Sequence, residues 1–294
     1  LRSLGARTEP YDIVYTDPKL RHQKIRLAAH RWNGPYPDGS VVRFSRSLYG
    51  CSAPVLYCQL QRGAPLARSV LLAYELCGTY AGGENSTLGS GLEAVTTVDA
   101  LRSFAEAHPD FSGARKALKA LAFVGNGAAS AMEAGASTVI CLPVRYGGFG
   151  LPVPALNFRM DLENRTIFID LFWPDARIGI EYDSRTWHAG QHKFEQDSQR
   201  RNMSRAAGIE LITVTKPEVQ SVQAFEDIAG YIAKRLGIRV RKKSAEFYEK
   251  HAKVRAEVFP FWRNEASSQM KDADPVIEYD PADEDAGHVF GAST

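Results

Sequence analysis

The stretch Ile169-Asp170-Leu171-Phe172-Trp173-Pro174-Asp175-Ala176-Arg177-Ile178-Gly179-Ile180-Glu181-Tyr182-Asp183 decides the fold of this chain. Its apolar residues predict two strands, over residues 166–172 and 177–183, on either side of Pro174-Asp175. A proline followed by an aspartate favours a tight turn, so the two strands are expected to form a hairpin. The hairpin is the starting point for the rest of the prediction.

Three carboxylates belong to this hairpin. Asp170 lies near the end of the first strand, and Glu181 and Asp183 share one face of the second because strand side chains alternate. Carboxylates among Ile, Leu and Phe are costly to bury unless a cation or hydrogen bonds satisfy them. A divalent metal between the acids would relieve their repulsion. The structural alternative is a buried pair, Asp170 and Glu181, that accepts backbone N–H bonds.

Further motifs lie on both sides of the hairpin. Downstream are Trp187-His188, then Asp197-Ser198-Gln199-Arg200-Arg201, then an apolar run over residues 208–215; upstream is Ser130-Ala131-Met132-Glu133. In this order, and together with the hairpin, these pieces resemble the very-short-patch-repair-like endonucleases, a family within the PD-(D/E)XK nuclease superfamily. The resemblance covers about residues 130–218.

The resemblance implies an α/β protein with a restriction-endonuclease-like mixed sheet flanked by helices. It also implies metal-dependent hydrolysis of DNA phosphodiester bonds, with Mg²⁺ as the cofactor and Mn²⁺ as a substitute. Hard cations are held by oxygens, often one or two carboxylates plus water. Asp170 and Glu181 are then the expected metal ligands, with the backbone carbonyl of Tyr182 as a third.

Asp183 departs from the family pattern, which has lysine at this position to orient the attacking water. We therefore hypothesise that His188, just after the strand, is the general acid or base. The alternative for His188 is an exposed loop histidine beside Trp187. Asp183 remains a candidate catalytic residue.

Basic residues after the hairpin are the expected DNA contacts. Lys193, Arg200 and Arg201 belong to a helix expected over residues 193–207, and guanidinium groups suit phosphate oxygens. Asp197 would orient His188 or Arg200. The alternative is that Asp197 and Arg201, four residues apart, form an ordinary surface pair worth about 0.3–0.5 kcal/mol.

Glu133 has two interpretations as well. Ser130 is the expected N-cap of a helix over residues 130–141, and Ser-x-x-Glu is the pattern of a capping box, which requires no function. The resemblance instead implies that the acid on this upstream helix points toward the metal.

Composition limits the class of protein. The chain has 294 residues, a formal net charge of +2 and 44% hydrophobic residues, as in ordinary globular proteins. No apolar run reaches the roughly 20 residues of a membrane span, and no signal-peptide pattern opens the chain. We expect a cytoplasmic protein without a membrane partner and with four free cysteines. The start at Leu1 is consistent with a fragment or an unusual start.

The pattern of turns and charges predicts five regions. Residues 1–97 form an N-terminal α+β region, truncated if a module precedes Leu1, with helices over 53–60 and 66–78. Residues 98–129 form a helical connector, 130–236 the endonuclease-like domain with a central strand over 209–215 and an amphipathic helix over 221–236, 237–262 a basic helical extension, and 263–294 a disordered acidic tail.

Two other functions remain open. Residues 51–54 and 74–80 are similar to a region of abortive-infection toxin–antitoxin regulators, which implies a protein partner of that type. With lysine missing at Asp183, this favours a catalytically degenerate, DNA-binding or regulatory module as the runner-up. A protein-interaction module with structural acids is the third class. Cutting both strands of a duplex with one site per chain would favour a homodimer.

Overall fold

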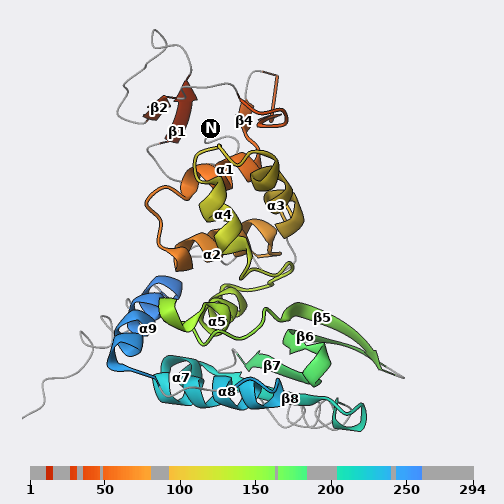
Figure 1. Ribbon diagram of the computed structural model, residues 1–294. Coiled ribbons are helices and arrows are strands. Elements are labelled where there is room, and N and C mark those ends of the chain that lie inside the picture. Colours follow the sequence, from red (N-terminus) through yellow and green to blue (C-terminus); the bar gives the residue numbers. More distant parts are fainter. Residues whose placement is uncertain are drawn as a thin grey trace, which may run out of the picture.

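The structure is a computed structural model that describes residues 11–15, 27–31, 36–46, 49–80, 93–162, 165–183, 204–239 and 243–259. Figure 1 shows a group of helices, α1 to α4, above α5, with a sheet and two further helices below. The chain is therefore a mixed α/β protein, as predicted.

The N-terminal part combines short strands with four helices. Strands β1 (Tyr11–Tyr15) and β2 (Leu27–Arg31) pair in parallel, and β3 (Val41–Arg43) and β4 (Tyr49–Cys51) pair antiparallel. The helices are α1 (Ala53–Leu60), α2 (Leu66–Cys77), α3 (Val98–Ala107) and α4 (Ala114–Leu121). The helices expected over 53–60 and 66–78 are confirmed.

The predicted hairpin lies within a four-stranded mixed sheet. Helix α5 (Ala131–Cys141) and the 3₁₀ turn η3 (Val144–Tyr146) precede it. The strands β5 (Ala155–Leu162), β6 (Arg165–Trp173), β7 (Ile178–Asp183) and β8 (Glu210–Thr215) are neighbours in that order. The first three are antiparallel meander strands, and β8 runs parallel to β7.

The turn of the hairpin is a short 3₁₀ segment, η4 (Pro174–Ala176). It ends at Arg177, whose left-handed backbone (φ 52°) lets its N–H donate to the Pro174 carbonyl. The Arg177 guanidinium then donates to the carbonyl of Gly208, which leads into β8. The strand expected over 209–215 is confirmed as β8, but its expected central position is wrong for the described sheet, in which β8 is an end strand that pairs only with β7.

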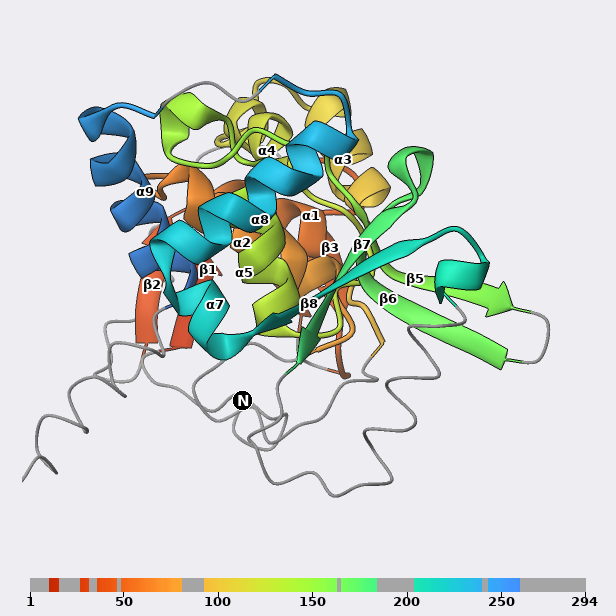
Figure 2. The same cartoon turned by 90° about the horizontal axis from the view of Figure 1, so that it is seen from below.

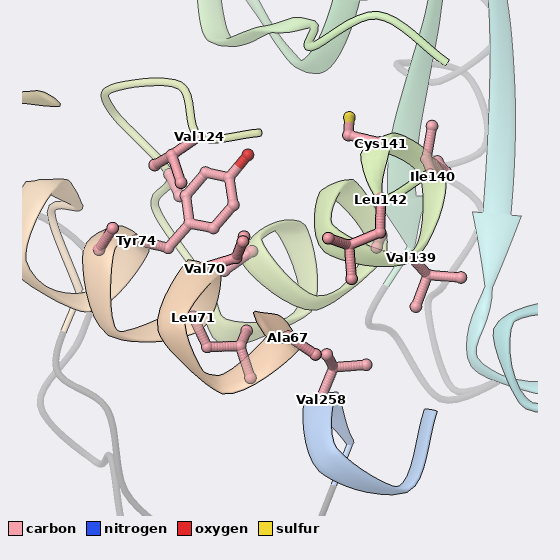
Figure 3. Packing of buried hydrophobic residues seen from close by; sticks show 14 of the residues in the cluster. Ala67, Val70, Leu71, Tyr74, Val124, Val139, Ile140, Cys141, Leu142 and Val258 are labelled. Carbon is pink, nitrogen blue, oxygen red and sulfur yellow. The ribbon is translucent and has the colours of Figure 1, made fainter. Parts of the chain in front are cut away.

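One large core joins the helices to the sheet. It contains buried residues from α2, α5, β6, β7, α8 (Val222–Arg235) and α9 (Ala245–Val258). The short helix α7 (Lys216–Gln220) connects β8 to α8. In Figure 1 α5 lies between α2 and α8, and in Figure 2, seen from below, α8 lies in front of α5. Figure 3 shows side chains of α2, α5 and α9, including Tyr74, Ile140 and Val258, meeting in this core.

The cysteines and the helix lengths bear on two further predictions. All four cysteines are free thiols, and three of them are buried. No helix in the described ranges has the length and apolar composition needed to cross a bilayer.

Candidate functional site

Strands β6 and β7 separate where the predicted acids lie. Their last ladder pair is Leu171 with Ile180, so continuing the register sets Asp170 opposite Glu181. Strand β7 nevertheless continues alongside β8 as far as the pair Asp183 and Thr215. Asp170 and Glu181 therefore lie at a fork between β6 and β7, directly beyond the last paired residues of the two strands.

The Asp170 carboxylate spans this fork. Its Oδ2 atom accepts the backbone N–H of Tyr182 at 2.7 Å. Because the N–H and C=O of one strand residue point to the same edge, the Tyr182 carbonyl is on the side of β7 that faces Asp170. Glu181 is half-buried and its Oε1 atom is shielded from solvent.

An irregularity in β5 and β6 accompanies the fork. Leu156 and its partner Leu171 belong to the large core, whereas Phe158 and its partner Ile169 pack in a second cluster on the other face. Residues two apart in a regular strand share a face, so both strands change face at the intervening position. Asn157, opposite Asp170 in this register, has a left-handed backbone with φ 46°.

Helix α5 holds Glu133 close enough to Asp170 for the two charges to repel. Its Oε2 atom accepts the Ala129 N–H at 2.8 Å and the Asn157 side-chain amide at 3.0 Å. Its Oε1 atom accepts the Ser130 hydroxyl at 2.8 Å, and the Ser130 oxygen accepts the Glu133 N–H. Ser130 is thus the N-cap, as expected. The Glu133 carboxylate, however, accepts the N–H of Ala129, the residue before the cap, rather than the N–H of Ser130.

Burial raises the pKa of Glu133 from 4.5 to about 7, because removing the carboxylate from water disfavours its charged form. The Ala129 N–H lowers the pKa by stabilising the anion, the Asp170 charge raises it by repulsion, and the Ser130 hydroxyl lowers it. Glu133 is only 6% exposed. A carboxyl group with a pKa near neutrality can both give and accept a proton.

The fork offers an oxygen-rich donor set of two strand carboxylates and a backbone carbonyl. Mg²⁺ commonly takes one or two carboxylates and keeps several waters, so Asp170, Glu181 and Tyr182 fit such an ion chemically. Among the described residues, however, no three His, Cys, Asp or Glu side chains are grouped closely enough to hold a metal by themselves. Glu133 and Asp183 are therefore not part of a ready-made metal cluster.

The other expected site residues divide into two groups. Asp183 ends β7, half-buried and two residues beyond Glu181. His188, Lys193, Asp197, Arg200 and Arg201 lie outside the described residues, as does most of the helix expected over 193–207. Their roles stay predictions.

Asn157 is the site residue that the sequence analysis did not identify. Besides Glu133, its amide donates to the Gly127 carbonyl at 3.2 Å. A signal was present, since asparagine tolerates the left-handed conformation better than most residues and interrupts the apolar run of β5. That signal does not reveal which acid the amide contacts.

No family model matches the sequence, and no solved structure matches it. The chain is similar to two uncharacterized proteins of Mycobacterium tuberculosis, from strains CDC 1551 and H37Rv. Each is 30% identical over 101 residues, which are 34% of this chain and 35% of the relative. The match thus spans about a third of the length of these curated relatives.

Proposed function

We propose that this chain is a metal-dependent endonuclease of the very-short-patch-repair-like type that hydrolyses DNA phosphodiester bonds. The observation that carries the proposal is the position of Asp170 and Glu181 at the β6–β7 fork, directly beyond the last ladder pair, with Glu133 close enough to Asp170 for the two charges to repel. The mixed sheet flanked by helices and the upstream Ser-x-x-Glu helix support it.

Each residue has a stated role in this proposal. Asp170, Glu181 and the Tyr182 carbonyl would hold Mg²⁺ or Mn²⁺, which neutralises charge on the phosphate and activates a water. Glu133, buried and with a raised pKa, would hold or release a proton beside Asp170. His188 would act as general acid or base, and Lys193, Arg200 and Arg201 would contact the DNA.

Asp183 favours a second function. Because the position normally occupied by lysine carries an acid, a nuclease fold that binds DNA or regulates a toxin–antitoxin partner without cutting is the alternative. A homodimer would suit either function, since duplex DNA presents two strands.

The test is cleavage of labelled single- and double-stranded DNA by the full chain with Mg²⁺, Mn²⁺ or EDTA. We expect metal-dependent cleavage that falls in Asp170→Asn and Glu181→Gln by at least the roughly 10- to 100-fold seen when even outer partners of a metal are lost. Asp175→Asn, an exposed acid in the turn of the same hairpin, is the matched control and should keep full activity.

Two results would change the conclusion. DNA binding without cleavage under every metal would select the non-catalytic alternative. Cleavage that persists in both fork variants would show that Asp170 and Glu181 are not the metal ligands.

A further inference from the structure

Helix α4 carries an uncompensated basic face. Its buried residues are alanines and Leu121, so Arg115 and Lys119, four positions apart, both point away from the core and are exposed. The helix contains no Asp or Glu. Its third cation, Lys116, donates instead to the carbonyl of Ala64, which leaves Arg115 and Lys119 as the outward charges.

A third outward cation, Arg145, joins this face from η3. The Lys119 ammonium lies 4.7 Å and the Arg145 guanidinium 4.9 Å from the centre of the Tyr146 ring. Since both cations contact one ring, their charges are held within about 10 Å of each other. Within the described ranges, no acid is within ion-pair distance of Arg115, Lys119 or Arg145.

This arrangement is unfavourable for the isolated protein. Like charges at positions i and i+4 of a helix destabilise it, and a third cation nearby adds repulsion. The ring of Tyr146 offsets part of this through cation–π attraction and fixes the two side chains in place. An anionic partner would remove the repulsion and find the cations already oriented.

We infer that Arg115, Lys119 and Arg145 form a contact surface for the phosphate backbone of a nucleic acid. We call these three residues, with Tyr146, the α4–η3 surface. The choice of nucleic acid rests on the proposed function; the existence of an anion-binding surface does not.

The chemistry of the surface favours a phosphodiester backbone over other polyanions. The planar guanidinium group of arginine can donate two parallel hydrogen bonds to phosphate oxygens. Several fixed cations close together also suit the regularly spaced negative charges of a nucleic-acid backbone. Within α4 and η3, Val144 is the exposed large hydrophobic residue, and one such residue is too little to anchor a membrane surface or an amphipathic peptide. The surface lies at the C-terminal end of α5, whereas Glu133 lies at its N-terminal end. It would therefore hold backbone away from the bond to be cut.

The test measures binding of a fluorescein-labelled duplex of about 20 base pairs to the full chain in EDTA, over a series of salt concentrations. Each phosphate contact contributes about 0.9 to the slope of log Kd against log salt, or roughly eightfold in affinity at 0.1 M salt. We expect Lys119→Gln and Arg145→Gln each to lower the slope by about one, and the double variant by about two. The control is Lys234→Gln, which removes an exposed cation of α8 that has no ion pair in the described part of the chain. It should leave the salt slope unchanged and alter the affinity by no more than twofold.

Outcomes separate this inference from the proposed function. An unchanged salt slope in the double variant, or an equal loss in Lys234→Gln, would overturn the α4–η3 surface while leaving cleavage at the fork open. A salt slope that falls in the double variant, in a protein that shows no metal-dependent cleavage, would support the surface and contradict the nuclease. Binding of a Glu-rich peptide or phosphatidylserine vesicles, but not of the duplex, would overturn the choice of partner.

Discussion

Asn157 links the geometry of the fork to Glu133. A non-glycine residue with φ 46° in a strand costs energy, and its side chain recovers part of that cost through hydrogen bonds to Glu133 and Gly127. Such strained residues are concentrated at functional sites. Here the strain coincides with the position where β5 and β6 change face, directly opposite Asp170.

We predict that Asn157→Ala lowers the free energy of unfolding by about 1–3 kcal/mol, because it loses both hydrogen bonds and keeps the strained φ. Asn157→Gly loses the same hydrogen bonds but adopts positive φ freely, so it should recover about 1 kcal/mol. Urea unfolding in EDTA measures both values. Equal destabilisation by Ala and Gly would show that the backbone conformation stores no strain.

Glu133 predicts a dependence of stability on pH. Its folded pKa of about 7 lies above its unfolded value of 4.5, so its contribution is complete below pH 4.5 and is lost as pH rises through 7. The loss is of the order of 3 kcal/mol. We expect the difference in unfolding free energy between wild type and Glu133→Gln to shift in favour of Gln between pH 5 and pH 8, in EDTA. A constant difference would contradict a raised pKa.

At the scale of elements, α9 is attached to the core by a buried histidine. His251 is 1% exposed, its Nδ1 lies 2.7 Å from the Gly147 carbonyl, and its ring stacks on Phe247. The hydrogen bond requires a proton on Nδ1, and the buried Nε2 atom has no hydrogen-bond partner in the described residues. A charged imidazolium would therefore place an unsatisfied N–H in the core, so the neutral ring suits this site.

Burial lowers the pKa of His251, the Gly147 carbonyl raises it, Arg255 lowers it, Glu226 raises it and Lys243 lowers it. The pKa of His251 in the folded state is therefore below the unfolded value of 6.5. Its contribution to the free energy of unfolding is fully present above pH 6.5 and is lost as the pH falls below that value. We predict that amides of α9 lose hydrogen-exchange protection between pH 7.5 and 5.5 relative to a pH-corrected reference. In His251→Leu this pH dependence should be absent; if it persists, another group causes it.

At the scale of the whole molecule, the N-terminal helices and the sheet share one core. The hydroxyl groups of Tyr74 in α2 and Ser137 in α5 share a hydrogen bond of 2.7 Å. A single hydrophobic cluster contains buried residues from Tyr57 in α1 to Phe259 after α9. Helix α5 is buried along nearly its whole length because it contacts α2, α9 and β6. A core shared in this way favours cooperative unfolding.

We therefore predict that Leu101→Ala in α3, at a fully buried position, destabilises the protein by about 2–5 kcal/mol. Hydrogen exchange should show reduced protection in β6 and β7 as well as in α1 to α4. Reduced protection confined to α1–α4 would show that the N-terminal helices unfold as a separate unit. Val95→Ala, at an exposed position just before α3, is the matched control and should change little.

The sequence by itself determined the elements whose residues decide their own conformation. Apolar alternation placed β6 and β7, Ser130 marked the start of α5, and glycine and proline marked the ends of the helices, because these signals act between residues close along the chain. The register that sets Asp170 opposite Glu181 does not follow from the sequence, because the tight Pro174-Asp175 turn expected there would pair Trp173 with Ala176, whereas the 3₁₀ turn pairs Trp173 with Ile178.

Only the tertiary structure decided the rest. The contact of Glu133 with Asn157, the change of face at Asp170, the end position of β8 and the meeting of Lys119 with Arg145 at Tyr146 all join residues distant in sequence. The pKa of Glu133 is likewise a property of its burial, which α5 acquires only when it packs between α2, α9 and the sheet. Local preferences carry no information on such contacts, because their energies arise only when the whole core has formed.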